Sequence, residues 1–265
     1  MTNIYTVMEK YFDIRYEFNK EQVHHSIARQ VEEKKPCYIC VADGNILNMV
    51  SHNRKYRKVI NDSIFSICDS SWVPVFVRWI YGYNYEQYCG SDIFIDIVRS
   101  RKYRMIFLGT KQETLDALQK NLAKENPDVM DMTFKELPFC DVNDFDYPAI
   151  AKSIEEDGAD IIWIALGAPK QEYFMNMLTP HLKKGVCIAI GAAFNFFSGL
   201  ATAPKRAPRW MVKWHMEFIH RIFLEPKKQI KRCWGIIVHL PRILWKEQRR
   251  KRKNQIKAHS GDKKW

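Results

Sequence analysis

Two short apolar runs that end in glycine set the strongest limit on how this chain can fold. They span residues 161–166 and 186–190, they are followed by Gly167 and Gly191, and a segment with helical spacing joins them. Runs buried on both faces and linked through a helix are typical of parallel strands in a sheet that helices cover. Ligands of such sheets gather at the carboxyl ends of the strands, so a site is expected around the two glycines.

The same alternation of apolar runs and helical segments extends over most of the chain. Further strands are expected near 11–16 and at 37–42, 63–69 and 103–110, with helices at 19–34, 46–59, 72–81, 111–125 and up to residue 101. The sequence therefore predicts an α/β fold, a Rossmann-like and mostly parallel sheet flanked by helices. No GxGxxG motif follows any strand, which argues against a dinucleotide-binding oxidoreductase.

The positive charge of the chain lies at its C-terminal end. The 265 residues carry a net charge of +12, but residues 204–265 hold 19 Lys and Arg against 4 Asp and Glu, or +15, which leaves −3 for residues 1–203. A basic region of this kind needs an anionic partner. We therefore divide the chain into an α/β domain (1–203) that binds the substrate and a basic helical appendage (204–265).

The segment after Pro226 combines clusters of basic residues with tryptophans. Its apolar part contains Trp234 and Trp245, is interrupted by Pro241 and is too short to cross a bilayer. These features favour an interfacial position on anionic lipid. The basic run 249–253 could also bind RNA without sequence specificity, but nothing else resembles a nucleic-acid-binding fold, so no specific nucleic acid is expected.

The N-terminal region carries no secretion signal, because residues 1–35 are polar and charged and lack an apolar core. The seven cysteines are scattered and mostly lie in apolar runs, as expected of buried thiols in a reducing compartment. The expected location is thus peripheral, on the cytoplasmic face of the plasma membrane.

Neither of two candidate metal motifs is convincing. Cys37 and Cys40 form a CxxC, but residues three apart on a strand point to opposite faces, and no second pair completes a zinc site. Asp144 and Asp146 resemble the DxD that holds a divalent cation in many sugar-nucleotide enzymes, yet nearby prolines favour a loop and a helix cap. We therefore expect no metal or other cofactor.

Four motifs in a fixed order carry a specific resemblance to one family. They are LGAPKQE (166–172), GAAFNFFSGL (191–200), RAPRW (206–210) and EFIHRIFLEP (217–226). Together they resemble the signature of the WecG/TagA/CpsF bacterial glycosyltransferases, and a weaker resemblance extends back to about Asp43. The resemblance implies inverting transfer of a sugar from a UDP-sugar to a membrane-embedded polyprenyl-diphosphate-linked sugar, in surface-polysaccharide or teichoic-acid assembly.

Two polar loops follow the first strands of the expected sheet. Asp69 ends one strand, where a carboxylate can accept a proton from a bound hydroxyl or can cap the next helix. The resemblance implies that Asp69 is the catalytic base. Asp43 and Asn45 follow another strand, in a turn that suits a nucleotide or sugar but could be a helix cap alone. The family usually has Thr-Pro-Asn there, so Asn45 matches while Asp43 replaces threonine, a change that could alter the preferred sugar.

The two glycine-ended strands supply the next candidates. Gly167 leads into a helix N-terminus with Lys170 and Gln171, which can hold an anionic group and orient a hydroxyl or phosphate. Glu172 beside them could cap the helix or form a salt bridge. The resemblance implies that Gln171 is an active-site residue. Gly191 begins a run of small and aromatic residues that could approach a ligand or pack in the core, and Asn195 stands where the family usually has aspartate.

Arginines of the appendage complete the expected site. Arg206 and Arg209 flank a proline turn, and guanidinium groups suit the bidentate recognition of a diphosphate, although a solvated basic face is the plainer interpretation. The resemblance implies that the appendage closes over the site, which adds Arg221 as a further candidate for stabilising the leaving group. Aromatic residues expected on a helix over 208–224 could also serve a contact between copies of the chain.

A second hypothesis is a non-catalytic protein that binds a nucleotide sugar or nucleic acid on the same core. Its support is the set of departures from the family pattern at Asp43, Ser70 and Gln87, the last of which replaces an arginine. Retention of Asp69 and Gln171 favours the enzyme.

Overall fold

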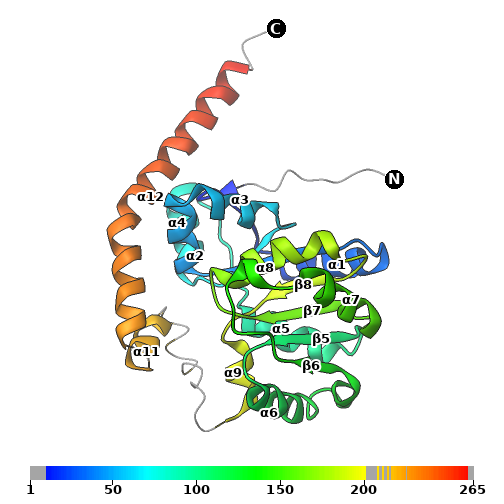
Figure 1. Cartoon of the computed structure of the whole chain (residues 1–265). Helices are drawn as coiled ribbons and strands as arrows, with labels where there is room; N and C mark the ends of the chain where they lie inside the picture. Colours follow the sequence, from blue (N-terminus) through cyan, green and yellow to red (C-terminus); the bar gives the residue numbers. More distant parts are fainter. Residues whose placement is uncertain are drawn as a thin grey trace.

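The computed structural model describes residues 10–200, 208, 211, 214, 216–224 and 226–261. In this part of the chain eight strands form one sheet, with helices on both of its faces (Figure 1). The strands are β1 (Lys10–Tyr11), β2 (Ile14–Glu17), β3 (Cys37–Ala42), β4 (Ser66–Cys68), β5 (Met105–Gly109), β6 (Thr133–Lys135), β7 (Ile161–Ala165) and β8 (Val186–Ala189).

The α-helices described in the N-terminal 200 residues are α1 (Lys20–Glu32), α2 (Gly44–His52), α3 (Arg54–Asp62), α4 (Trp72–Tyr81), α5 (Gly90–Ser100), α6 (Gln112–Leu122), α7 (Tyr147–Asp157), α8 (Lys170–Leu178) and α9 (Ala193–Ser198). Short 3₁₀ helices lie at η1 (Pro127–Asp131), η2 (Val142–Asp144) and η3 (Thr179–His181). Two helices, α11 (Glu217–Leu224) and α12 (Pro226–Gly261), follow at the C-terminal end.

The strand order creates a crevice near the middle of the sheet. The order is β1-β2-β4-β3-β8-β7-β5-β6, and all neighbours are parallel except the antiparallel pair β1 and β2. The strand that follows β3 in the chain, β4, pairs with one side of β3, and the last strand, β8, pairs with its other side. The connections therefore leave β3 and β8 on opposite sides of a switch point, where ligands bind in open α/β sheets.

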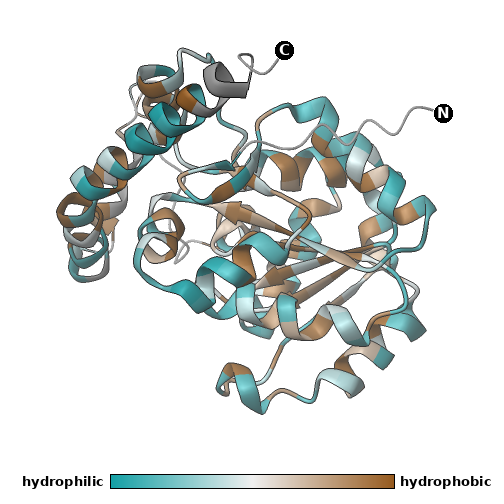
Figure 2. Cartoon of the chain, turned by 90° about the horizontal axis from the view of Figure 1, so that it is seen from above, coloured by the Kyte–Doolittle hydropathy of each residue, from teal (hydrophilic) through white to brown (hydrophobic). Residues whose placement is uncertain are grey.

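The core follows the alternation of side chains along buried strands. Along β3, Cys40 packs in one cluster, with α2, α3, α4, α7 and α8. Cys37 and Ile39 pack in a second cluster on the other face, with α1, α5, α6 and α9. Figure 2 shows the resulting layers, with brown strands between helices that are teal on their outer sides. The prediction that Cys37 and Cys40 point to opposite faces is confirmed.

Two expected elements are each divided in the structure. The strand expected near 11–16 is a tight hairpin of β1 and β2, with positive φ angles at Phe12 and Asp13. The helix expected over 46–59 is α2 followed by α3, because Asn53 ends the first and caps the second, its Oδ1 accepting from Tyr56 N at 3.0 Å. In the sequence, an asparagine inside the helical pattern was the signal for this break, because asparagine is a favoured N-cap residue.

The C-terminal helix α12 runs through the proline that was expected to interrupt its segment. Pro241 lies inside α12 and is exposed, so water can reach the carbonyl that loses its helical donor. On its inner side α12 packs closely on α2. A methyl group at Gly235 would come within 3.1 Å of Asn48 Nδ2, and one at Gly44 within 3.3 Å of Ile236 Cδ1.

Across the described ranges, no helix combines the length and apolar character needed to cross a bilayer.

Candidate functional site

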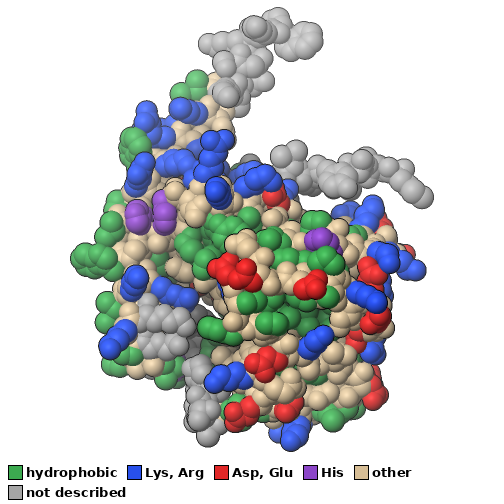
Figure 3. Space-filling model, in the orientation of Figure 1, with side chains coloured by type: hydrophobic (Ala, Val, Ile, Leu, Met, Phe, Trp, Pro, Cys, Tyr) green, Lys and Arg blue, Asp and Glu red, His purple; other side chains and the backbone are tan. Residues whose placement is uncertain are grey.

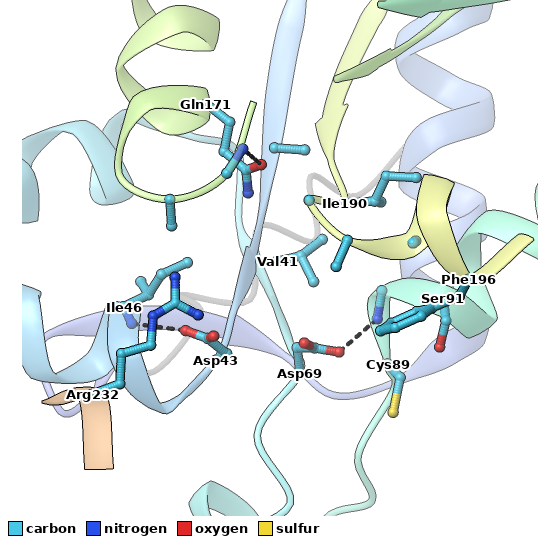
Figure 4. A pocket seen from close by; sticks show the side chains of 17 residues that line it. Val41, Asp43, Ile46, Asp69, Cys89, Ser91, Gln171, Ile190, Phe196 and Arg232 are labelled. Atoms are coloured by element: carbon cyan, nitrogen blue, oxygen red, sulfur yellow. Dashed lines mark hydrogen bonds between the residues drawn. The ribbon is translucent and has the colours of Figure 1, made fainter. Parts of the chain in front are cut away.

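A pocket opens where the sequence predicted one, at the carboxyl ends of β3, β4, β7 and β8 (Figure 4). It is bounded by the loops after these strands, by the first turn of α5, by α9 and by one side chain of α12. The described lining residues are Val41, Asp43, Ile46, Asp69, Cys89, Gly90, Ser91, Gly167, Ala168, Gln171, Ala189, Ile190, Gly191, Ala192, Ala193, Phe196 and Arg232.

Two carboxylates lie on one side of this pocket. Asp43 is the N-cap of α2, with its Oδ1 accepting from Ile46 N at 2.9 Å, so the capping interpretation is confirmed for a residue that also lines the pocket. Asp69 follows β4, and its Oδ1 accepts from Gly90 N at 2.8 Å. The helix after Asp69, α4, has Ser71 at its N-cap and no side-chain cap bond. Capping of α4 by Asp69 was therefore wrong.

Gly90 has no side chain, so its backbone can come close enough to donate a hydrogen bond to the Asp69 carboxylate. A methyl group at Gly90 would lie 2.8 Å from Val41 Cγ1, so a larger residue would push the start of α5 away from β3 and β4. Gln87 also supports this loop, because its Nε2 donates to the backbone oxygen of Asp69 at 2.9 Å. One carboxylate oxygen of Asp69 is thus fixed by backbone at the pocket edge.

On the opposite side, Gln171 closes the turn between β7 and α8. Its Oε1 accepts from Gly167 N at 3.0 Å, and its own backbone N–H donates to Gly167 O at 3.0 Å. Gly167 has φ of 75°, a left-handed conformation that glycine adopts without strain. A methyl group at Gly191 would lie 3.5 Å from Gln171 Oε1, so the amide rests against the β8 loop.

Glu172 lies behind Gln171 and is fully buried. Its Oε1 accepts from Gln171 Nε2 at 2.8 Å, and its Oε2 accepts from Tyr56 OH at 3.0 Å. Burial raises the pKa of Glu172 to about 7, although these two hydrogen bonds act to lower it. The cap and the salt bridge that the sequence offered for Glu172 miss its main feature, a buried carboxylate that joins Gln171 to Tyr56, because burial cannot be read from a helix N-terminal position.

Arg232 is a charged lining residue that the sequence did not reveal. Arg232 reaches the pocket from α12, and Figure 4 shows its guanidinium beside the Asp43 carboxylate. Among the described lining residues it is the only Lys or Arg. Phe196, on α9, covers the other end of the pocket, while Phe194 is buried in the core. One aromatic residue of this run thus lines the pocket and another packs in the core.

Several predicted residues lie elsewhere. Asn45 and Asn195 are half-buried and, like Lys170, do not belong to the lining in the described part of the chain. Lys170 Nζ donates to Cys140 O and lies 4.9 Å from the ring centre of Phe145, which draws it away from the pocket. Arg206 and Arg209 fall outside the described residues. Arg221 belongs to α11, and its side chain is likewise outside the description.

The DxD candidate is a capping arrangement. Asp146 Oδ1 accepts from Ala149 N at 3.0 Å and caps α7, as the loop interpretation predicted. Asp144 ends the 3₁₀ helix η2 and is exposed. Over the described residues, no group of three or more His, Cys, Asp or Glu is arranged to hold a metal ion.

The described groups could bind a hydroxyl group and an anion in the same pocket. Asp69 offers a carboxylate that could accept a proton, Arg232 offers a guanidinium that could bind a phosphate, and Gln171 offers an amide that could orient either. Backbone N–H groups at the ends of β7 and β8 add further donors.

Comparison with known proteins identifies similar chains. Residues 10–256 match the family described as "Glycosyl transferase WecG/TagA/CpsF family". An N-acetylglucosaminyldiphosphoundecaprenol N-acetyl-beta-D-mannosaminyltransferase of Bacillus subtilis (strain 168) is 27% identical over 224 residues, which cover 83% of this chain and 84% of the relative. Proteins of the same description from Bacillus spizizenii (22% identical, 84% and 82% covered) and Staphylococcus aureus strain NCTC 8325 (24% identical, 82% and 81% covered) are also similar.

Proposed function

The chain belongs to the WecG/TagA/CpsF family of glycosyltransferases, and from that premise we propose that it transfers a sugar from a UDP-sugar to a polyprenyl-diphosphate-linked sugar. The observation that carries the proposal is the meeting of Asp69, Gln171 and Arg232 in one pocket. A base, a neutral hydrogen-bonding group and a cation are the groups that such a displacement requires. The reaction would serve bacterial surface-polysaccharide or teichoic-acid assembly.

In this mechanism Asp69 takes the proton from the acceptor hydroxyl. Its Oδ1 is already oriented by Gly90 N–H, which fixes the plane of the carboxylate before the acceptor binds. The activated oxygen attacks the anomeric carbon of the donor directly, so the configuration at that carbon inverts. Gln171, on the opposite wall, positions a substrate hydroxyl or phosphate.

The departing UDP gains negative charge on its diphosphate, and Arg232 is placed to neutralise it. A guanidinium can bind two phosphate oxygens at once. Backbone donors around Gly167 and Gly191, other than the Gly167 N–H that already donates to Gln171 Oε1, would add to this stabilisation, and Arg206, Arg209 and Arg221 remain candidates for the same task. With these cations the reaction would need no metal ion, so turnover should persist in excess chelator.

The acceptor is proposed from the names of the curated relatives, which act on N-acetylglucosaminyldiphosphoundecaprenol. We propose an acceptor of the same chemistry, a sugar on a polyprenyl diphosphate. The donor sugar need not be the N-acetylmannosamine of those names, because Asp43 places a carboxylate where the resemblance has threonine.

The outer face of α12 supports a position on the membrane surface. Trp234 and Trp245 are 68% and 58% exposed, and they lie on one side of the helix with Ile230, Ile237 and Val238. The exposed basic residues along the helix are Lys227, Lys231, Arg242, Lys246, Arg249, Arg252 and Lys253. Figure 3 shows Lys and Arg gathered along α12 and hydrophobic side chains at its outer edge. An apolar stripe among cations suits anionic lipid, so we propose peripheral attachment to the cytoplasmic face of the plasma membrane.

The central test is a transfer assay in detergent. The full chain is offered a panel of UDP-sugars with a short-chain polyprenyl-diphosphate N-acetylglucosamine, and UDP release and glycolipid mass are measured. Acceptor-dependent product is expected from one donor. Asp69→Asn should lower kcat by roughly 10²- to 10⁴-fold, as loss of a general base does. Asp128→Asn, an exposed carboxylate on η1, is the matched control and should leave turnover unchanged.

Two results would reject this function. Binding of a UDP-sugar without turnover of any donor and acceptor pair would favour a non-catalytic binding protein. The second concerns a chain that lacks residues 226–265, which should lose both liposome binding and transfer. If the full chain bound RNA strongly and did not bind liposomes, and the shortened chain lost the RNA binding, the results would favour a nucleic-acid-binding protein.

A further inference from the structure

A chain of buried hydrogen bonds runs behind the pocket wall. Tyr56 OH donates to Glu172 Oε2, Gln171 Nε2 donates to Glu172 Oε1, and Gly167 N donates to Gln171 Oε1, at 3.0, 2.8 and 3.0 Å. Tyr56, Gln171 and Glu172 are each at most 5% exposed. The chain thus joins α3 to the β7 loop through Gln171, the one amide side chain among the described residues that line the pocket.

The two ends of the Gln171 amide are held by groups of opposite kind. The Gly167 N–H needs an acceptor, and an ionised Glu172 carboxylate can only accept. A flipped amide would set donor against donor at Gly167 and oxygen against oxygen at Glu172. Ionised Glu172 therefore fixes the amide in one orientation and leaves its second N–H and a second lone pair on Oε1 for a ligand.

Protonation of Glu172 would weaken this arrangement. A proton on Oε1 would face the Gln171 N–H, and a proton on Oε2 would face the Tyr56 hydroxyl unless that group rotated. In either case the charge-assisted bond to Gln171, about twice as strong as a neutral one, is lost. The ionisation state of Glu172 is therefore coupled to the orientation of the amide.

We propose that Glu172 is a positioning residue, which in its ionised form holds the Gln171 amide in the orientation that binds substrate. The proposal rests on the proposed function for its substrate. Glu172 does not line the pocket, so it acts through Gln171.

The surroundings of Glu172 place its titration near neutral pH. Burial raises its pKa to about 7, and the nearby Asp43 carboxylate acts in the same direction. The hydrogen bonds from Gln171 and Tyr56 lower it. Cys40 of β3 also faces Glu172, but burial raises the pKa of the Cys40 thiol well above its usual range, so it stays neutral. A pH change around 7 should therefore alter the hold on Gln171.

The test follows the Gln171 side-chain amide by NMR in the full chain, with the signal assigned by its loss in Gln171→Glu. The amide shifts should titrate with a midpoint near pH 7. Glu172→Gln should abolish the titration, because it keeps the shape and removes the charge. Tyr56→Phe should move the midpoint to higher pH, because one donor to the ionised carboxylate is gone. Glu113→Gln, an exposed carboxyl on α6, should change nothing.

The kinetic counterpart is measured where transfer is active. At pH 8 Glu172→Gln should lower kcat about 10-fold, because the group that positions the substrate is no longer held in one orientation, and the fall in wild-type kcat below pH 7 should flatten. An amide that does not titrate, or that titrates alike in wild type and Glu172→Gln, overturns the proposal. An unmoved midpoint in Tyr56→Phe does so even if Glu172→Gln fails to fold. Because the NMR readout needs no turnover, a titrating amide in an inactive protein would reject the proposed function alone.

Discussion

The α/β core and the helix α12 are held together by different kinds of contact. In the core, strands are buried on both faces by apolar side chains, as in β3, where all six residues are buried. On α12 the buried residues include Ile243, but also Gln229 and Glu247, and the largest aromatic side chains face solvent. The core thus gains stability from apolar burial, whereas α12 leaves much of its apolar surface exposed.

The attachment of α12 is mainly polar at its C-terminal half. Glu247 is 3% exposed and accepts from Tyr81 OH at 2.9 Å, and Arg250 donates to the same carboxylate at 2.5 Å. Lys246 Nζ donates to Asp13 Oδ2 at 2.5 Å, in the turn between β1 and β2. Polar contacts of this kind fix the orientation of a helix without burying its apolar face. The pocket consequently gains Arg232 while Trp234 and Trp245 stay exposed.

The sharpest way to test the contrast is a matched pair of tryptophan substitutions. Trp163 on β7 is fully buried, with its ring centre 4.9 Å from that of Phe94. Trp163→Ala should cost about 3–5 kcal/mol of unfolding free energy, measured by urea unfolding. Trp234→Ala should change stability by less than about 0.5 kcal/mol but weaken binding to anionic liposomes. Equal stability losses in the two variants would erase the distinction between core and α12.

A second prediction concerns the charge buried inside the core. Because burial raises the pKa of Glu172 from 4.5 to about 7, the folded chain holds an extra proton between these values and loses stability as pH rises through them. Above pH 7 the ionised carboxylate costs on the order of 3 kcal/mol. Glu172→Gln should therefore be more stable than wild type at pH 8 and nearly equal near pH 5, by urea unfolding. A difference that does not vary with pH would contradict buried ionisation.

Arg232 tests whether α12 contributes to chemistry as well as to attachment. Arg232→Gln should lower kcat/KM roughly 100-fold, as loss of one group that stabilises developing charge does, with little change in Tm. Lys231→Gln, exposed on the same helix, is the control and should retain turnover. Full activity of Arg232→Gln would exclude a role of Arg232 in transfer and would leave membrane attachment as the proposed role of α12.

The smallest effect is expected at the anchor between Lys246 and Asp13. Burial tends to raise the pKa of Asp13, but Lys246, Arg57 and Arg250 more than offset it and lower the pKa. Lys246→Ala should cost less than about 1 kcal/mol, because the ammonium is 57% exposed. The loss should shrink in high salt, and also in acid as pH falls through the lowered pKa of Asp13 and the carboxylate is protonated. Unfolding at two salt concentrations measures it, and a loss independent of salt would point to packing instead.

Most of the core could be predicted because local patterns decide it. Apolar runs that end in Asp69, Gly167 and Gly191 locate the strand ends, and parallel pairing brings such ends to one edge. For the same reason the strand-end candidates Asp43, Asp69, Gly167, Gln171 and Gly191 line one pocket.

The missed residues depend on tertiary contacts that no local pattern records. The sequence of α12 is apolar and basic around much of its circumference, so periodicity alone did not reveal which side faces α2 or that Arg232 faces the pocket. Gln229, Ile243 and Glu247 lie 14 and then 4 residues apart, close to whole helical turns, and this spacing was the signal available. The burial of Glu172 was missed for a related reason: an acidic residue in the first turn of a helix is usually solvated, and its partner Tyr56 is 116 residues away in the chain.

The thickness of α12 sets a length scale for the acceptor. Arg232 faces the pocket and Trp234 faces outward, two residues apart and so on nearly opposite sides of one helix. An α-helix with its side chains is about 10–12 Å across. With its outer face resting on a bilayer, α12 would hold the diphosphate of the donor about one helix diameter above the lipid. The acceptor hydroxyl would have to reach that height to attack the donor, so transfer would depend on the length of the acceptor's headgroup and not on the length of its isoprenoid chain.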